Sequence, residues 1–258
     1  MTVANHRFGY RFEVENVARL ETNGVNFSML MSAWAGKLPA WNVEADPMEF
    51  VSTQEDQGQI GSCVGNSGSS VVESCYFLKT GRKVQLSRAA AYYLSQAVDG
   101  IRGDNGATMR GFQEVATKHG LCLESEWPYV PRYNPSEPAG CRYDFKVVAT
   151  KPIKTLADFD AWIMSGLPVH VGLMWNSTCD GDIVSNYNPN LRNSGGHAVM
   201  FWNKRGGNYR MLNSWGNWNK DGQNEWTPRA IETALANRWT VAVGYAPDGL
   251  LSPIGEVL

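Results

Sequence analysis

The stretch that most constrains this chain is residues 57–63, Gln-Gly-Gln-Ile-Gly-Ser-Cys, because it places Cys63 at the head of a segment of helix length. Unpaired backbone N–H groups and the positive end of the helix dipole favour a thiolate at that position. A thiolate is the nucleophile that acyl-transfer chemistry requires. On this stretch alone, the better interpretation of Cys63 is an unreactive buried thiol, the usual state of a free cysteine. The rest of the chain reverses that interpretation.

Length and composition indicate a globular protein with a sizeable core. A chain of 258 residues suits one large domain or two packed lobes, and 43% hydrophobic with 19% charged residues excludes a disordered chain. The net charge of -2 gives no electrostatic basis for binding nucleic acid or an anionic membrane. No apolar run is long enough to span a membrane, and residues 1–7 lack the apolar block of a signal peptide. We therefore expect a cytoplasmic location, or one within a particle assembled in the cytoplasm.

The cysteines do not form a disulfide or metal pattern. They are Cys63, Cys75, Cys122, Cys141 and Cys179, an odd number with no C-x-x-C spacing. A secreted disulfide framework and a zinc site are therefore not expected, and nothing in the sequence predicts a metal or another cofactor.

The first part of the chain is expected to feed a long buried helix. Residues 1–37 have no strong periodicity and are interpreted as an N-terminal arm, with one short helix over 27–35. An extended segment follows to residue 57, and apolar spacing predicts a helix over 63–80 that ends at Gly81. Small polar residues at 65–70 favour a loop by propensity. We expect a buried helix whose small residues allow close packing.

The remaining helices and strands are predicted from the spacing of apolar residues and from capping residues. Helices are expected from Ser87 as N-cap, over about 108–118, near 156–165, and from Pro228 to about 237, with strands near 146–149, 169–175 and 239–245. The proline-rich stretch 127–138 is the expected crossing between lobes. His170 lies within an expected strand, where a structural histidine, packed or half-exposed, is the favoured interpretation.

A hairpin is expected to bring two polar side chains together. Residues 194–202 and 208–216 read as strands joined by a turn at 205–207. His197 is near the start of the first strand and Asn213 near the end of its antiparallel partner. The two residues are therefore expected to be spatial neighbours.

With Cys63, His197 and Asn213 in view, the sequence resembles the papain-like cysteine peptidases (peptidase family C1), whose histidine and asparagine lie far downstream of the cysteine. Gln57 together with residues 61–63 matches the family's glutamine and nucleophile block. The other matching runs are 71–73, 80–81, 120–129, 197–199 and 213–216. Each run is weak alone, but their order and spacing over about 38–226 make a specific signal.

The resemblance implies an α+β fold of the papain-like, two-lobed kind. A helical lobe, about 63–145, would pack on a β-barrel-like lobe made of about 146–258 plus the 38–62 segment. The active site would lie in the cleft between the lobes. Residues 1–37 would be an extension outside the 38–258 peptidase domain.

The resemblance also implies catalytic roles. Cys63 would attack a peptide carbonyl as thiolate, with His197 as base and then acid. Asn213 would orient the imidazole. The Gln57 side chain and the backbone N–H of Cys63 would stabilise the oxyanion.

Four further residues are expected to bind substrate or shield the site. They are Gly106, Ala107, Gly196 and Trp215. Trp215 would cover the histidine–asparagine pair and exclude water. Ala107 stands where relatives have a glycine that hydrogen-bonds the substrate strand, so its methyl group is expected to narrow the cleft.

The chain departs from the usual family pattern in its disulfides, and two of its runs resemble one branch of the family. Ile60 and Asp104 stand where many relatives have bridging cysteines, so that disulfide is absent, and Cys141 also lacks its common mate; both losses fit a reducing compartment. Residues 104–110 and 120–124 look like the bacterial and viral branch.

The leading functional hypothesis is a cysteine endopeptidase acting on polypeptides. Two alternatives stay open. One is a structural or binding part of an assembly such as a virus particle, joined through the N-terminal arm, with a dormant or single-use site. The other is an acyl-transfer relative, transglutaminase-like or deamidating. The arm is also a candidate autoinhibitor that lies in the cleft.

Overall fold

The computed structural model describes residues 7–12 and 46–247. The helices are α2 (Cys63–Thr80), α3 (Arg88–Asp99), α4 (Met109–Glu114), α5 (Leu156–Met164) and α6 (Pro228–Leu235), with short 3-10 turns at Pro47–Glu49 and Ser177–Cys179. The strands are β1 (Val147–Pro152), β2 (Val169–Trp175), β3 (Ile183–Val184), β4 (Gly195–Arg205), β5 (Asn208–Leu212), β6 (Gln223–Trp226) and β7 (Val241–Pro247). They form one sheet in the order β1-β7-β2-β4-β5-β6-β3. The expected α+β fold is confirmed.

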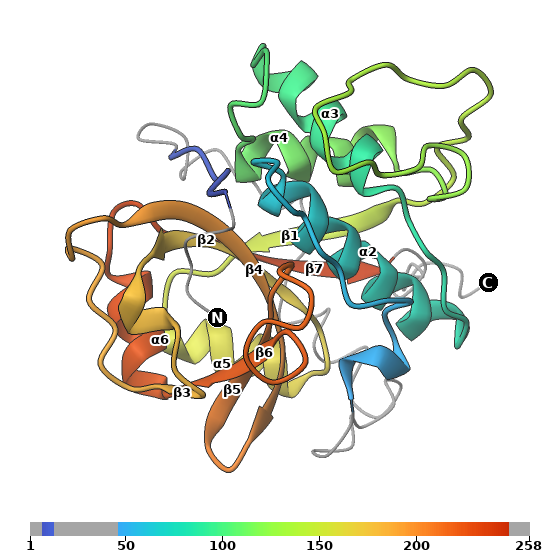
Figure 1. The fold of residues 1–258 in the computed structure, drawn as a ribbon. Coiled ribbons are helices and arrows are strands. Elements are labelled where there is room, and N and C mark those ends of the chain that lie inside the picture. Colours follow the sequence, from blue (N-terminus) through green and yellow to red (C-terminus); the bar gives the residue numbers. More distant parts are fainter. Residues whose placement is uncertain (1–6, 13–45, 248–258) are drawn as a thin grey trace, which may run out of the picture.

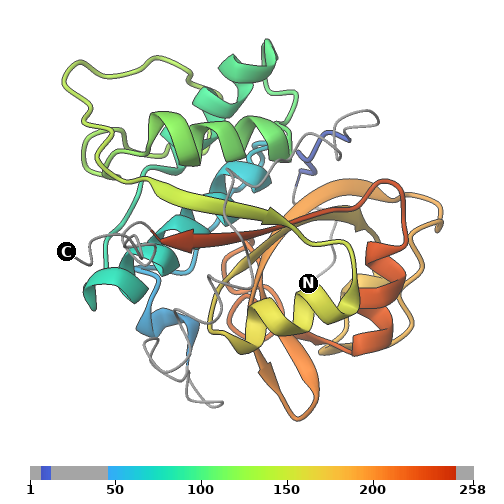
Figure 2. The same cartoon turned by 180° about the vertical axis from the view of Figure 1, so that it is seen from behind.

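The helices divide into two groups around the sheet. Figure 1 shows α3 and α4 together beyond α2, whereas α5 and α6 lie at the opposite end, beside the strands. Figure 2 shows the same division from behind. Helix α2 packs against α3 on one side and against β4 and β7 on the other. It therefore forms the boundary between the helical part and the sheet, with its N-terminus directed at the site described below.

Helix α2 forms despite a run of residues that favours loops. Almost its whole first half is buried, and Gly81 ends it in the left-handed conformation (φ 67°), as predicted. Gly65 explains the small residues, because a β-carbon there would lie 2.7 Å from the backbone nitrogen of Tyr92 in α3. Gly68 packs in the same way against the Phe112 ring. Close tertiary packing thus overrides local propensity.

The predicted hairpin is confirmed. Strands β4 and β5 pair antiparallel, and Gly206 and Gly207 form the turn with φ values of 56° and 89°. Strand β4 is also paired with β2 along its first half, where Leu173 lies opposite His197. His197 is therefore held by its pairing with β2, in the part of β4 that precedes the first β4–β5 pair at Met200.

Most other sequence expectations agree with the structure. Ser87 caps α3 through the Ala90 N–H, and α4 continues as a π-helical turn to His119. His170 is the packed structural residue expected, because its Nε2 lies 2.7 Å from the Ser67 hydroxyl and burial lowers its pKa to about 3. The expected helix over 27–35 lies outside the described residues. Among the described helices, none is both long and apolar enough to cross a bilayer.

Candidate active site

Cys63 is the first residue of α2 and is completely buried. Its thiol contacts the backbone N–H groups of Ala198 and Gly9, which stabilise negative charge on sulfur. Burial nevertheless dominates and raises the pKa of the Cys63 thiol to about 11. The expectation of a readily ionised thiolate is therefore wrong for this state of the protein. The physical reason is desolvation, to which the N-terminal residues described below contribute.

His197 and Asn213 meet as the hairpin predicts. His197 Nε2 lies 2.8 Å from Asn213 Oδ1, and both residues are buried. The same oxygen accepts the Ser214 backbone N–H at 2.8 Å, which identifies it as the amide oxygen. Since that oxygen can only accept, His197 carries its proton on Nε2, and Nδ1 is the nitrogen that can take up another.

An aromatic cluster encloses the imidazole. The Trp215 ring stacks on His197 with ring centroids 4.4 Å apart and planes 28° from parallel. Trp175 meets the same imidazole edge-on at 5.1 Å, and Trp218 packs against both tryptophans. The position of Trp215 is the one expected for a residue that shields the histidine–asparagine pair. Such an enclosure excludes water and strengthens the hydrogen bond between the pair.

Gln57 precedes Cys63 by six residues in the chain, and its side chain is fully buried. Its Oε1 accepts the Ser214 hydroxyl at 2.8 Å, which fixes Nε2 as the donor end of the amide. Nε2 donates to the carbonyl oxygens of Ile60 (2.9 Å) and Arg7 (2.8 Å). A carbonyl oxygen from the N-terminal segment therefore already occupies the donor that we expected to serve an oxyanion.

Residues 7–12 occupy the cleft beside Cys63 and pair with both of its walls. On one side, the Ala107 N–H donates to Gly9 O at 2.9 Å and the Arg11 N–H donates to Ala107 O at 3.0 Å. On the other side, the Tyr10 N–H donates to Gly196 O at 2.9 Å. Figure 1 shows this segment, in dark blue, beside α4 and β2. The expected narrowing by the Ala107 methyl group does not prevent a strand from pairing there.

Glycines make this close approach possible. A β-carbon at Gly106 would lie 2.1 Å from Gly9 O, and one at Gly196 would lie 2.0 Å from Tyr10 O. At Gly195 it would lie 2.1 Å from the Phe8 ring, which also approaches Trp215 at 6.2 Å between ring centroids. Gly106 and Gly196, both predicted to bind substrate, are thus in contact with the segment that fills the cleft.

Asp104 takes over the connection that the missing disulfide would provide. Its Oδ1 accepts the Gly61 N–H at 2.9 Å and the Tyr92 hydroxyl at 2.8 Å, which ties the 103–106 loop to the segment before Cys63. Its Oδ2 forms an ion pair with Arg7 at 2.7 Å. Asp104 therefore holds both the cleft wall and the segment that fills the cleft.

The contacts that residues 8–10 make in the cleft could not be predicted individually from the sequence. The available signal is a glycine between two aromatic residues, Phe8-Gly9-Tyr10, within a stretch that lacks helical or strand periodicity. That pattern is too short to predict a site. The autoinhibitor hypothesis concerned the whole of 1–37, and residues 1–6 and 13–37 lie outside the described part.

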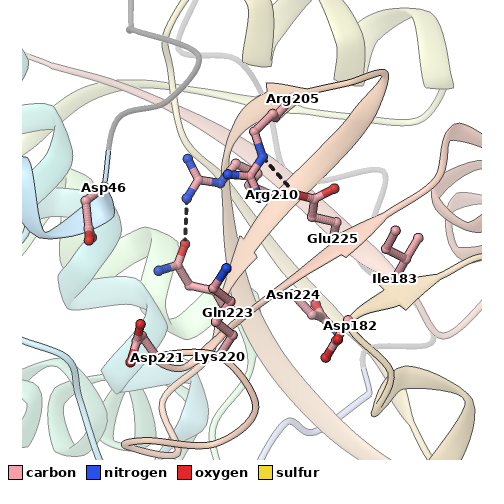
Figure 3. Close-up of a pocket in the computed structure, with 10 residues that line it drawn as sticks. All are labelled: Asp46, Asp182, Ile183, Arg205, Arg210, Lys220, Asp221, Gln223, Asn224 and Glu225. Atoms are coloured by element: carbon pink, nitrogen blue, oxygen red, sulfur yellow. Dashed lines mark hydrogen bonds and ion pairs between the residues drawn. The ribbon is translucent and has the colours of Figure 1, made fainter.

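A second pocket, of about 290 Å³, lies between β3, β5, β6 and the loop at Asp221. Figure 3 shows two of its arginine side chains joined to neighbours in the lining. Arg205 pairs with Glu225, and Arg210 donates to Gln223 at 3.1 Å. Its lining includes neither Cys63 nor the histidine–asparagine pair. We therefore assign the chemistry to the cleft at α2.

Known proteins share this architecture. The crystal structure of xylellain, a cysteine protease from Xylella fastidiosa, superimposes with a TM-score of 0.72 over 93% of this chain and 96% of that one, at 22% identity. The Carica candamarcensis cysteine protease CMS1MS2, solved in complex with E-64, gives a TM-score of 0.62 over 79% of this chain and 97% of that one, at 18% identity. At these identities the likeness establishes the fold.

Sequence relatives match over part of their length. Human cathepsin L2 is 34% identical over 113 residues, which cover 42% of this chain and 34% of that protein. Cysteine proteinase 3 of Dictyostelium discoideum is 32% identical over 111 residues, 43% of this chain and 32% of that protein. The match thus spans about a third of the length of these curated relatives. The sequence model described as papain family cysteine protease matches residues 40–233, three-quarters of the chain. The chain belongs to the papain family of cysteine proteases.

Proposed function

We propose that this protein is a cysteine endopeptidase in which Cys63, His197 and Asn213 act together on peptide bonds. The observation that carries the proposal is the 2.8 Å bond from His197 Nε2 to Asn213, because it presents Nδ1 as a base within the enclosed site. The backbone N–H of Ala198, next to His197, contacts the Cys63 sulfur. The Cys63 sulfur on α2 therefore contacts the residue that directly follows His197 on β4.

The proposed reaction has two stages. His197 takes the thiol proton, and the Cys63 sulfur attacks the carbonyl carbon of the substrate. The C–N bond then breaks as His197 returns the proton to the leaving amine, which leaves a thioester on Cys63. A water molecule, deprotonated by His197, attacks the thioester, releases the carboxylic acid and regenerates the thiol.

Gln57 is proposed to stabilise the oxyanion formed in both stages. Its Nε2 donates to a carbonyl oxygen, that of Arg7, so its geometry suits an oxygen placed beside Cys63. The Ser214 hydroxyl bound to Oε1 keeps the amide in that orientation. A single donor of this kind contributes about 3 kcal/mol to transition-state binding.

The described state is proposed to be latent. Residues 7–12 pair with Ala107 and Gly196, their Arg7 carbonyl takes the Gln57 donor, and their Gly9 backbone contacts the Cys63 sulfur. A peptide substrate would need the same groups. This use of the arm within its own chain favours an inhibitory role for these residues over attachment to an assembly, which would require them to leave the cleft.

The test uses the full chain. Hydrolysis of denatured casein and labelling by the epoxide E-64 are measured for the wild type, for Gly9→Ala and for Gly9→Ala/Cys63→Ala. A β-carbon at Gly9 would lie 1.9 Å from Gly61 O, so Gly9→Ala is expected to displace the segment and raise both rates. The double variant should show neither activity nor labelling. Transfer of the acyl group to an added amine without hydrolysis would support the acyl-transfer alternative instead.

A further inference from the structure

The side chain of Tyr10 fills a pocket in the wall of the cleft. Tyr10 is only 4% exposed, and its backbone N–H is bonded to Gly196 O at 2.9 Å. The preceding residue, Gly9, contacts the Cys63 sulfur through its backbone. Any peptide strand that takes the place of this segment would direct a side chain into the same pocket, one residue from the nucleophile.

The pocket owes its depth to a glycine in the centre of the sheet. Gly172 lies within β2, opposite Ala198 of β4 on one side and Val241 of β7 on the other. A β-carbon there would lie 2.8 Å from Cε2 and Cζ of the Tyr10 ring and 2.9 Å from Cε1. Glycine weakens a strand interior and marks the close approach of another group. Here that group is the Tyr10 ring, and a single methyl group at residue 172 would leave no room for it.

The pocket also contains one polar contact. The Tyr10 hydroxyl donates to the backbone carbonyl oxygen of Trp239 at 3.1 Å. That oxygen can accept from a tyrosine and cannot bond to the edge of a phenylalanine ring. A buried acceptor that loses its partner is costly, which is how such pockets discriminate between side chains that differ by one hydroxyl.

We propose that the pocket formed by Gly172 and the Trp239 carbonyl is the specificity pocket of this peptidase, and that it selects substrates with a tyrosine. Phenylalanine fits the same space without the hydrogen bond, and short branched side chains such as valine fill it poorly. The proposal rests on the proposed function, since it assigns the substrate class of the same cleft. Residues 7–12 then occupy the cleft and place Tyr10, the preferred type of side chain, in the pocket.

The experiment uses the full chain carrying Gly9→Ala, in which the segment is displaced and the pocket is open. Fluorogenic tetrapeptides are compared in which each position in turn is tyrosine, O-methyltyrosine, phenylalanine or valine. At one position we expect kcat/KM for tyrosine to exceed that for phenylalanine by about three- to tenfold, and valine to be at least about tenfold below phenylalanine. O-methyltyrosine, which cannot donate, should fall to the phenylalanine level or below.

Gly172→Ala, added to the same background, tests the depth of the pocket. It should lower kcat/KM for tyrosine and phenylalanine by about tenfold or more and leave the valine peptide unchanged. Gly181→Ala is the matched control, because the nearest atom to its added β-carbon is 3.6 Å away. The ratio of kcat/KM for the tyrosine peptide to that for the phenylalanine peptide is measured without a substitution in the pocket wall. It therefore tests the proposal even if Gly172→Ala does not fold.

Three results would overturn the inference. Hydrolysis without preference at any position, or an equal loss for all peptides with a folded Gly172→Ala variant, would refute the specificity and leave the proposed peptidase intact. If neither the peptides nor denatured casein are hydrolysed by any variant, the proposed function fails and the specificity fails with it.

Discussion

Gly9 and Gly61 lie so close that a β-carbon added to Gly9 would be 1.9 Å from the Gly61 carbonyl oxygen and 2.2 Å from its carbonyl carbon. The obstacle is backbone, which cannot move aside as a side chain can. It belongs to the segment that also carries Cys63. The N-terminal segment can therefore cover Cys63 only because residue 9 is glycine, which makes Gly9→Ala a direct means of uncovering that thiol.

The ionisation of Cys63 is expected to depend on this contact. Burial raises the pKa of the thiol to about 11, so alkylation of wild-type Cys63 by iodoacetamide should be slow at pH 7 and rise as the pH approaches 11. Gly9→Ala should move the whole profile to lower pH, because water and the α2 N-terminus then stabilise the thiolate. The measurement is the modified fraction of the Cys63 peptide by mass spectrometry, from pH 6 to pH 11.

Gly181→Ala is the control for that experiment and should follow the wild-type profile. A profile that is identical in wild type and Gly9→Ala would contradict the assignment of residues 7–12 as the cause of the burial.

Asn213 is expected to act on the rate of reaction more than on substrate binding. In the Gly9→Ala background, Asn213→Ala should lower kcat by about 10- to 100-fold with little change in KM, because the imidazole loses the partner that fixes its tautomer. Steady-state kinetics on one fluorogenic peptide measure both constants. Asn190→Ala, at an exposed asparagine, is the control. An effect confined to KM would assign Asn213 to substrate binding.

Gly65 is expected to be required for the packing of α2 on α3. Gly65→Ala places a β-carbon 2.7 Å from Tyr92 N and 2.9 Å from Tyr92 Cα, both backbone atoms. The overlap should cost about 1–3 kcal/mol, which exceeds the gain of about 1 kcal/mol in helix propensity. Urea unfolding measures the difference. Gly181→Ala serves again as the uncrowded comparison, and a stabilised Gly65→Ala variant would show that α2 and α3 can separate at no cost.

Glu73 is expected to make stability fall with rising pH. It is buried in α2, accepts the Leu86 N–H at 2.8 Å, and desolvation raises its pKa to about 8. The folded state therefore keeps a proton that the unfolded chain releases near pH 4.5, so this stabilisation is complete below pH 4.5 and is lost as the pH rises to 8. Glu55, with a pKa raised to about 7 by burial, acts in the same direction.

The corresponding test is urea unfolding at pH 5 and pH 8. Glu73→Gln should reduce the wild-type difference in unfolding free energy between the two pH values by roughly 3 kcal/mol, and Glu55 should contribute a further part of that difference. Glu232→Gln, at an exposed position of α6, should leave the difference unchanged. An unchanged difference in Glu73→Gln would mean that Glu73 is ionised in the folded protein.

The parts of the fold that depend on local signals were predictable from the sequence. Gly81 at the end of α2, Ser87 before α3 and the glycine pair of the β4–β5 turn each act through their own backbone geometry. The proximity of His197 and Asn213 followed from the hairpin register. These features require no knowledge of contacts made by distant segments.

The state of the site was predictable only in outline, with the arm as one candidate occupant of the cleft, because the details depend on contacts between segments far apart in the chain. A helix N-terminus favours the Cys63 thiolate, but burial outweighs it, and burial is decided partly by Gly9 and its neighbours. Likewise, Asp104 was recognised only as the place of a missing cysteine. Its bonds to Gly61, Tyr92 and Arg7 become evident when the three segments are placed together.

The ion pair and backbone bonds that seat residues 7–12 join parts of one covalent chain. Dilution therefore leaves the local concentration of this competitor unchanged. An incoming peptide must outcompete a rival that diffusion cannot remove. Dilution alone would therefore not open the site, and latency would persist at any protein concentration.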